Sequence, residues 1–197
     1  MSLPSSGTIK MSQVRDELKK TGPISLGNAD VRKLGGKPSG TIKMSDLYGK
    51  STIPDGFIEY KLTIERNEEL LQFNVIAYGL SCEFSNRTYG SIIPSKYEGY
   101  NIINCSAMTE VNDTYYAFSV QLSKKINSGI ASDYLTSLKS VEMYIAEIGE
   151  IISMTNDGGL WYYQLKTSHD DLKGIKFFNF FQQHFNKTVN ICLRYNK

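Results

Sequence analysis

The sequence is poor in the residues that build reactive centres. It has three cysteines, two histidines and one tryptophan among 197 residues, and its formal net charge is only +2. So few histidines and cysteines make a zinc site or a catalytic triad hard to assemble, because each needs several converging side chains. An odd number of cysteines, far apart in the chain, predicts free buried thiols. We therefore expect no enzyme activity, no cofactor and no metal.

Long apolar runs and strong charge are missing as well. No window approaches the roughly twenty apolar residues of a membrane span. The first seven residues have neither the basic nor the apolar region of a signal peptide. Nearly balanced charge argues against a protein that holds nucleic acid through phosphate contacts. We expect a protein made in the cytoplasm without a signal peptide, with no membrane and no nucleic-acid partner.

Two acidic groups leave alternatives open. The run His169-Asp-Asp171 could bind a cation, but a solvated polar turn explains it more simply because a calcium site needs about six to eight oxygen ligands. Glu147 and Glu150 could form a carboxylate pair of the kind that cleaves glycosides. Alternating charges on an exposed strand explain these two glutamates equally well.

A short phrase recurs three times in the first fifty residues. Residues 7–12 and 40–45 both read Gly-Thr-Ile-Lys-Met-Ser, and residues 22–27 read Gly-Pro-Ile-Ser-Leu-Gly. Apolar residues alternate within each copy, which predicts a short extended segment with one buried face. The polar residues Ser12, Asn28 and Ser45 are then placed to cap helices. Each copy predicts a strand, a cap and one or two helical turns.

No copy is long enough to bury its own apolar face, so the copies must stack on one another or on a partner. One interpretation is a small self-packed cap on the domain that follows. The other is a docking segment, residues 1–50, that completes its core against a neighbouring subunit. The docking interpretation assigns the contact to Ile9, Met11, Ile24, Leu26, Ile42, Met44 and Leu47.

After a predicted linker at residues 51–56 the pattern changes to period-two alternation. Residues 58–64 and 71–77 each place apolar side chains at every second position and predict a hairpin. Later runs repeat the alternation at 116–122, 141–145, 160–165 and 189–195. The chain is thus predicted to be mainly β, with an antiparallel β-sandwich or partly open barrel over residues 57–197. Residues 174–185 fit either a bulged strand or a short amphipathic helix.

The wording of the N-terminal copies is specific. It runs Leu3-Pro-Ser-Ser-Gly7 before the first copy, Gly22-Pro-Ile-Ser-Leu26 in the second, and Ser39-Gly-Thr-Ile-Lys-Met-Ser-Asp-Leu-Tyr-Gly-Lys50 in the third. This resembles the opening of tailed-bacteriophage structural proteins, which carry a Gly-x-Ile-Ser-Met-Ser-x-Leu phrase in tail, fibre and other virion components. Lys10 and Lys43 depart from the family, which more often has Ser there. The resemblance implies a non-enzymatic virion structural protein, associated with the tail or its fibres, that docks through these repeats to other virion proteins.

The second region has a looser resemblance. The order Tyr78-Gly79, Tyr89-Gly-Ser-Ile-Ile-Pro94, Tyr97-x-Gly-Tyr100 and an aromatic cluster from residue 160 is similar to β-rich modules of phage and prophage proteins. The family's closed symmetry implies a homo-oligomer, a trimer or a ring, in the virion. Two alternatives remain: a host-surface receptor-binding module whose Trp161, Tyr162 and Tyr163 contact glycan, and a head-decoration or neck protein.

Overall fold

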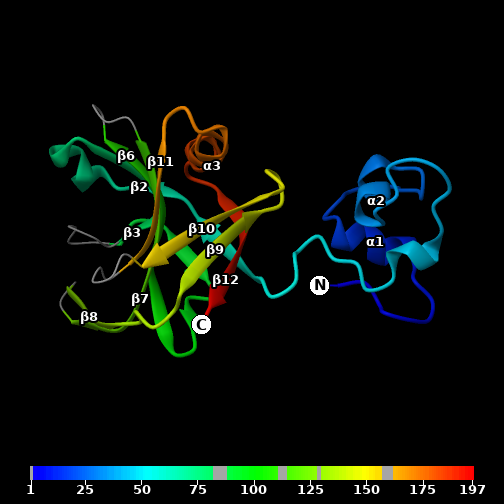
Figure 1. The fold of residues 1–197 in the computed structure, drawn as a ribbon, viewed down its shortest axis with the longest axis horizontal. Coiled ribbons are helices and arrows are strands. Elements are labelled where there is room, and N and C mark those ends of the chain that lie inside the picture. Colours follow the sequence, from blue (N-terminus) through cyan, green and yellow to red (C-terminus); the bar gives the residue numbers. More distant parts are fainter. Residues whose placement is uncertain (1, 82–87, 111–114, 128–129, 157–161) are drawn as a thin grey trace. The chain divides into compact units, whose positions relative to one another are not determined.

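The computed structural model describes residues 2–81, 88–110, 115–127, 130–156 and 162–197. The chain forms two compact units, Met1–Gly56 and Phe57–Lys197, and each has its own apolar core (Figure 1). Each unit is described by itself below.

The first unit is built from three short helices. They are α1 (Met11–Glu17), α2 (Ala29–Leu34) and the 3-10 helix η1 (Met44–Leu47). The described part of this unit contains no β-strand, so the strands predicted within the repeated phrases are wrong. Residues 7–10 and 40–43 lead into their helices without pairing with another strand. A short extended segment that has no partner strand is not a stable β-strand.

The helices of copies one and three start earlier than predicted. Their N-cap residues are Lys10 and Lys43, whose backbone N–H groups donate to Gln13 Oε1 at 2.7 Å and to Asp46 Oδ2 at 2.8 Å. The predicted serine caps are therefore wrong. A polar side chain three residues after the cap, which is one half of a capping box, fixes the helix start instead. In copy two Asn28 caps α2 as predicted, by accepting from the N–H group two residues on at 3.0 Å.

The second unit is one antiparallel sheet of twelve strands that curls into a half-barrel (Figure 1). The strands are β1 (Ile58–Thr63), β2 (Glu65–Arg66), β3 (Val75–Ser81), β4 (Ser91–Ile93), β5 (Lys96–Tyr97), β6 (Tyr100–Glu110), β7 (Tyr115–Asn127), β8 (Ile130–Tyr134), β9 (Ser140–Ile145), β10 (Glu150–Asn156), β11 (Tyr163–Ser168) and β12 (Thr188–Asn196). Their order is β2-β3-β6-β7-β11-β10-β9-β12-β1-β4, with β5 beside β6 and β8 beside β7. The prediction of a mainly β, partly open barrel is confirmed.

The two ends of this strand order are connected along the chain. Strand β1, which is next to last in the order, is followed almost at once by β2, which is first. Strand β1 pairs with β12 in the register Tyr60 to Ile191, and β2 pairs with β3 in the register Glu65 to Gly79. One bent segment of chain therefore joins the two sides of the curled sheet.

The predicted hairpin of residues 58–64 with 71–77 is wrong, because β1 pairs with β12 and β4, and only the two residues of β2 pair with β3. Residues Glu68–Phe73 form the 3-10 helix η2, and β3 starts at Val75. The helix begins because Asn67 accepts from the Glu69 N–H at 3.1 Å, and it ends at Asn74, whose φ is +59°. The apolar alternation before residue 75 thus belongs to a helical turn.

Two glycines lie where neighbouring backbones come close: Gly90, just before β4, approaches β1 and β3, and Gly79 of β3 approaches β6. A Cβ atom on Gly90 would be 2.3 Å from the carbonyl oxygen of Gly79 and 2.5 Å from that of Thr63. A Cβ atom on Gly79 would be 2.3 Å from the carbonyl oxygen of Cys105. Both glycines also have positive φ, +70° and +134°. Only a residue without a side chain fits at either position.

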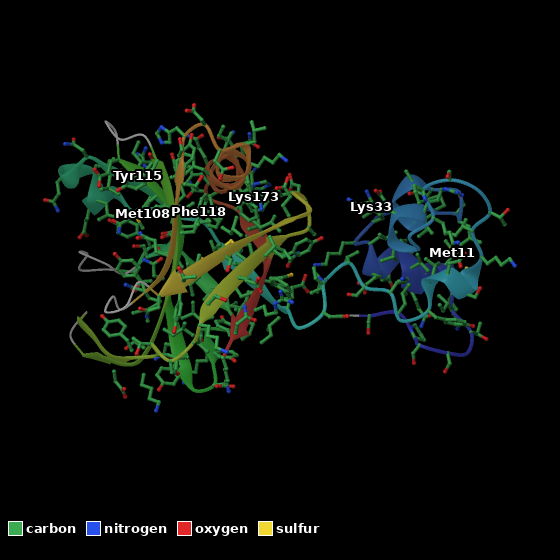
Figure 2. The ribbon with its side chains drawn as sticks, viewed as in Figure 1. Met11, Lys33, Met108, Tyr115, Phe118 and Lys173 are labelled. Atoms are coloured by element: carbon green, nitrogen blue, oxygen red, sulfur yellow. The ribbon has the colours of Figure 1, made fainter. Side chains whose placement is uncertain are left out.

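The core of the barrel is closed by the helix α3 (Leu172–Gln183) (Figures 1 and 2). Residues 174–185 are thus mostly helical, and the alternative of a bulged strand is wrong. Asp171 caps the helix by accepting from the Lys173 N–H at 3.0 Å. The helix buries Phe177 edge-on against Phe118 of β7, with ring centroids 6.1 Å apart. Aromatic packing of this kind anchors the helix to the sheet.

We expect the second unit to fold without the first. It contains all twelve strands, α3 and a separate apolar core. A chain starting at Phe57 should therefore unfold in one cooperative transition, with a melting temperature close to that of the same unit in the full chain. Calorimetry of both proteins tests this. A molten or aggregating product would show that the first unit belongs to the main core.

The stability of the second unit should fall at alkaline pH because of Cys105. This cysteine is free, and burial raises the pKa of its thiol from the ordinary 9.0 to about 12. The unfolded thiol ionises near pH 9 while the folded thiol stays protonated, so the stabilisation is complete below pH 9 and is lost between pH 9 and 12. The expected loss is about 1.4 kcal/mol per pH unit. Urea unfolding at pH 8, 9 and 10 measures it, and Cys105→Ala should show a shallower decline; equal slopes would contradict this.

Candidate functional site

The three repeated phrases pack into one small core. Its fully buried members come from the start of the chain and from all three helices: Leu3, Ile9, Val14, Val31 and Leu47. Seven further apolar side chains are half-buried against them: Met11, Leu18, Ile24, Leu26, Leu34, Ile42 and Met44. The copies therefore stack on one another, as the self-packed interpretation holds.

This packing divides the seven predicted docking residues. Ile9 is 7% exposed and Leu47 is 0% exposed, so the prediction that these two insert into a partner is wrong. They face inward because the other copies bury them. The remaining five keep part of their surface outside the core, and we call them the rim residues: Met11, Ile24, Leu26, Ile42 and Met44.

The segment before the first repeated phrase is bonded to the end of the third. The Leu3 N–H donates to the Lys50 carbonyl at 2.8 Å, and the Gly49 N–H donates to the Pro4 carbonyl at 3.0 Å. These bonds hold the ends of the unit together, so the rim residues sit on a closed frame rather than on a loose arm.

A buried carboxylate also fixes the start of the predicted linker. Glu17 is 6% exposed, and its Oε1 accepts from Ser51 Oγ at 3.0 Å, from the Thr52 N–H at 2.7 Å and from Thr52 Oγ1 at 3.0 Å. Residues 51 and 52 therefore belong to the folded unit. The connection from these residues to Phe57 is therefore shorter than the predicted linker of 51–56.

Replacing Glu17 by alanine should loosen this exit. The Ser51 hydroxyl and the Thr52 N–H would lose this acceptor, while the Thr52 hydroxyl would keep the Glu17 backbone carbonyl at 3.3 Å. Loss of a hydrogen bond to a charged group costs about 1.5 to 3 kcal/mol. We expect amide exchange at residues 50–53 to rise by at least about tenfold. Asp16→Ala is the matched control, since its carboxylate lies on the surface beside Arg15 and should change stability by less than about 0.5 kcal/mol. Equal effects of the two changes would show that the Glu17 carboxylate does not hold residues 51 and 52.

The two units differ in net charge. Residues 1–56 contain nine basic and five acidic residues, a net charge of +4, whereas residues 57–197 contain 13 and 15, a net charge of −2. Lys20 bonds to Asp30 at 2.8 Å and holds the pKa of that carboxyl below its ordinary value. Lys10 and Lys43, which immediately precede two rim residues, are exposed. The rim therefore lies in a basic setting that favours an acidic neighbour.

The predicted glycan contacts are not displayed together. Tyr163 is 0% exposed, and its hydroxyl donates to the Leu135 carbonyl at 3.2 Å and accepts from the Leu138 N–H at 3.0 Å. Tyr163 lies opposite the buried Val120, so alternation along β11 turns it inward. The prediction that Tyr163 contacts glycan is wrong. Tyr162 is half-buried, and Trp161 lies outside the described residues.

The run His169-Asp-Asp171 does not converge on a cation. His169 Nε2 lies 3.1 Å from Thr109 Oγ1, and Asp171 is occupied in capping α3. The Thr167 hydroxyl lowers the pKa of Asp171 by donating to it. Nowhere in the described ranges do three or more His, Cys, Asp or Glu side chains gather as a metal site.

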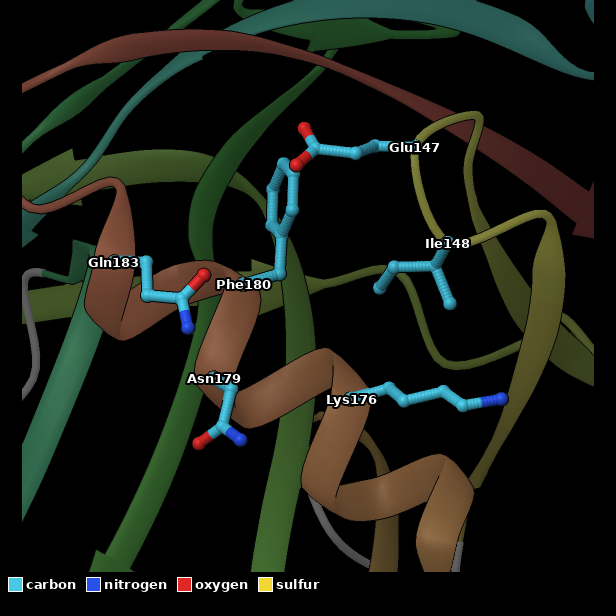
Figure 3. Close-up of a pocket in the computed structure, with 6 residues that line it drawn as sticks. All are labelled: Glu147, Ile148, Lys176, Asn179, Phe180 and Gln183. Atoms are coloured by element: carbon cyan, nitrogen blue, oxygen red, sulfur yellow. The ribbon is translucent and has the colours of Figure 1, made fainter.

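Glu147 and Glu150 do not form the carboxylate pair considered above. Glu150 bonds to Lys176 of α3, and Glu147 Oε2 lies 3.7 Å from His184 Nε2. Each glutamate therefore has a basic partner from α3 or its C-terminal end. Glu147 and Lys176 line a shallow surface pocket between α3 and the β9–β10 turn, together with Ile148, Asn179, Phe180 and Gln183 (Figure 3).

Alternation also fails to predict a buried polar face on the sheet. Asn104, Ser106 and Ser119 are each at most 2% exposed, and Asn104 Oδ1 accepts from Ser106 Oγ at 2.8 Å and from Ser119 Oγ at 3.3 Å. From sequence alone, small polar residues at alternate positions of a strand indicate a face exposed to solvent. Mutual hydrogen bonds allow them to be buried instead.

No known protein family, characterised protein or solved structure matches the chain. Within the described helices, none is long and apolar enough to cross a membrane.

Proposed function

We propose that the protein is a non-enzymatic structural component of a tailed-bacteriophage particle, associated with the tail or its fibres, and that residues 1–56 dock it to a neighbouring virion protein. The resemblance of residues 3–50 to the openings of such proteins supports the biological setting. The small core with its half-buried rim supports the docking role.

The rim is the observation that carries the proposal. A unit of this size gains only about 3 to 5 kcal/mol from its core. Complete burial of an apolar side chain such as Met44 contributes about 1.5 to 3 kcal/mol relative to full exposure. Covering five half-buried rim residues would therefore add stabilisation comparable to that of the core itself. A partner that covers the rim both binds the unit and stabilises it.

The charge of the unit adds a requirement on the partner. A net charge of +4 on residues 1–56 favours an acidic docking surface, since complementary charge speeds encounter and fixes register. In the proposed particle the protein is present in several symmetric copies, as a trimer or a ring.

Quantitative mass spectrometry of purified particles tests the proposal. Particles purified from cells that produce the phage should contain the full chain in a fixed copy number. That number should be a multiple of the order of the rotational symmetry at the site of attachment. A chain that starts at Phe57, first checked to be folded by calorimetry, should be at least about tenfold depleted from particles. Absence of the full chain from particles would overturn the virion assignment. Equal incorporation of both chains would overturn docking through residues 1–56.

A further inference from the structure

The side of the sheet that faces away from α3 carries apolar side chains with exposed surface. Val75 of β3, Met108 of β6 and Tyr115 of β7 are half-buried. Each is next to a residue that packs in the core, so alternation along the strand turns all three to the opposite side. The neighbouring helix η2 exposes 38% of Leu71. We call these four residues the outer face.

The strand register brings the three sheet residues of the outer face together. Val75 lies opposite Glu110 in the β3–β6 ladder, and Met108 is two residues from Glu110 on the same side of β6. The Tyr115 hydroxyl donates to Glu110 Oε1 at 3.3 Å. All three apolar side chains therefore surround one glutamate; Met108 and Tyr115 can be followed in Figure 2.

The surroundings of the outer face are acidic. Residues 65–71 contain three glutamates and one arginine, and Arg66 is already paired with Glu68 at 2.7 Å. Glu110 adds a negative charge, and Lys166, whose Nζ lies 4.6 Å from an aromatic ring of the outer face, adds a positive charge. Four glutamates and two basic side chains give this surface a net charge of −2.

The most exposed apolar side chain on the strands has a different setting. Ile93 of β4 is 65% exposed, but it lies opposite Lys61 in the β1–β4 ladder and is followed by Lys96. A basic docking unit would meet like charge at Ile93, whereas it meets opposite charge at the outer face.

We propose that the outer face receives the rim of another copy of this chain. The rim presents five apolar side chains on a unit with a net charge of +4, and the outer face presents four on an acidic surface. Charge favours this pairing over contact between two rims, in which both units are basic. The pairing joins two different surfaces, so each copy can contact one neighbour through its rim and another through its outer face. This inference rests on the proposed docking role of the rim and names its partner.

Sedimentation velocity of the full chain tests the pairing. Its mass should rise above that of one copy at concentrations below about 1 mM. Association should weaken at least about threefold when NaCl is raised from about 0.1 M to about 1 M, because salt screens complementary charge. Leu71→Ser should weaken association at least about tenfold, since it removes an apolar contact. Leu172→Ser is the matched control, because it changes an exposed leucine outside the outer face and should leave association unchanged.

A mixture of two variants tests whether the two surfaces are partners. Lys10→Glu with Lys43→Glu places negative charge beside the rim and leaves the apolar core of the first unit intact. Leu71→Ser impairs only the outer face. At a concentration where the unchanged chain assembles, each variant alone should be monomeric. An equimolar mixture should form a dimer and nothing larger, because one intact rim and one intact outer face remain. Calorimetry confirms that each variant is folded.

Several results would overturn the pairing. They are a full chain that stays monomeric up to about 1 mM, association that salt does not weaken, equal weakening by Leu172→Ser, and a mixture that stays monomeric or assembles like the unchanged chain. Any of them would leave docking of residues 1–56 to a different virion protein untouched. That role stands or falls on incorporation into particles, so the two failures are distinguishable.

Discussion

The Gly90→Ala protein should lose more than about 4 kcal/mol of unfolding free energy in its second unit, or fail to fold. An alanine Cβ would stand 2.3 Å and 2.5 Å from two carbonyl oxygens of neighbouring backbone segments, at a φ of +70°. Backbone cannot move aside as a flexible side chain can, so the strands β1, β3 and β4 must separate. Urea unfolding of the chain that starts at Phe57 measures the loss without a contribution from the first unit.

Gly99 provides the matched control for this change. It has a similar φ of +82°, in the turn between β5 and β6, but a Cβ atom there would meet nothing within 4 Å. Gly99→Ala should therefore cost only the backbone strain of about 1 to 2 kcal/mol. The difference between the losses of unfolding free energy in the two variants measures the cost of the clash between the Cβ atom and the neighbouring backbone. Equal losses would mean that the strands do not converge at Gly90 as described.

The second large effect concerns the rim. Changing Met11 and Met44 together to serine should weaken docking roughly 30- to 1,000-fold, since loss of two partly buried methionines removes about 2 to 4 kcal/mol. Incorporation into particles should fall accordingly. These residues occupy equivalent positions in two copies of one phrase, so both changes act on the same kind of contact.

Two neighbouring threonines control for the position of these changes. Thr8→Ser with Thr41→Ser alters the same two phrases at exposed sites and should leave incorporation unchanged. The melting of the first unit is measured in the free proteins, because Met11 and Met44 also touch its core. Normal incorporation of the methionine variant, together with much earlier melting of the free unit, would make the rim purely an internal cap.

Local patterns predicted much of the fold. The apolar alternation from residue 58 onward predicted a mainly β second unit, because period two survives wherever one face of a strand is buried. The Asn28 cap was also predictable, since capping depends on residues close in sequence. Residues 174–185 remained ambiguous because five closely spaced phenylalanines satisfy both periods. Phe177 and Phe178 pack against Phe118 and Tyr116 of β7, and this distant contact favours the helix.

Long-range pairing was not predictable in the same way. Strand β1 pairs with β12, at the far end of the unit, and no local pattern identifies that partner. The inward orientation of Tyr163 follows from its register with Val120 of β7, which is likewise a distant contact. Among candidate sites, the repeated phrases were visible in the sequence. The pocket was not, because Glu147 and Asn179 approach only after α3 packs beside the β9–β10 turn.

Hydrogen exchange of residues 1–56 in the free protein and in purified particles tests the docking claim most directly. Our account predicts that peptides containing Met11, Ile24 to Leu26, and Ile42 to Met44 become at least about tenfold more protected in the particle. Core peptides around Val14 should change only through the added stability of the unit. Unchanged exchange across residues 1–56, with new protection confined to residues 57–197, would contradict docking through the rim.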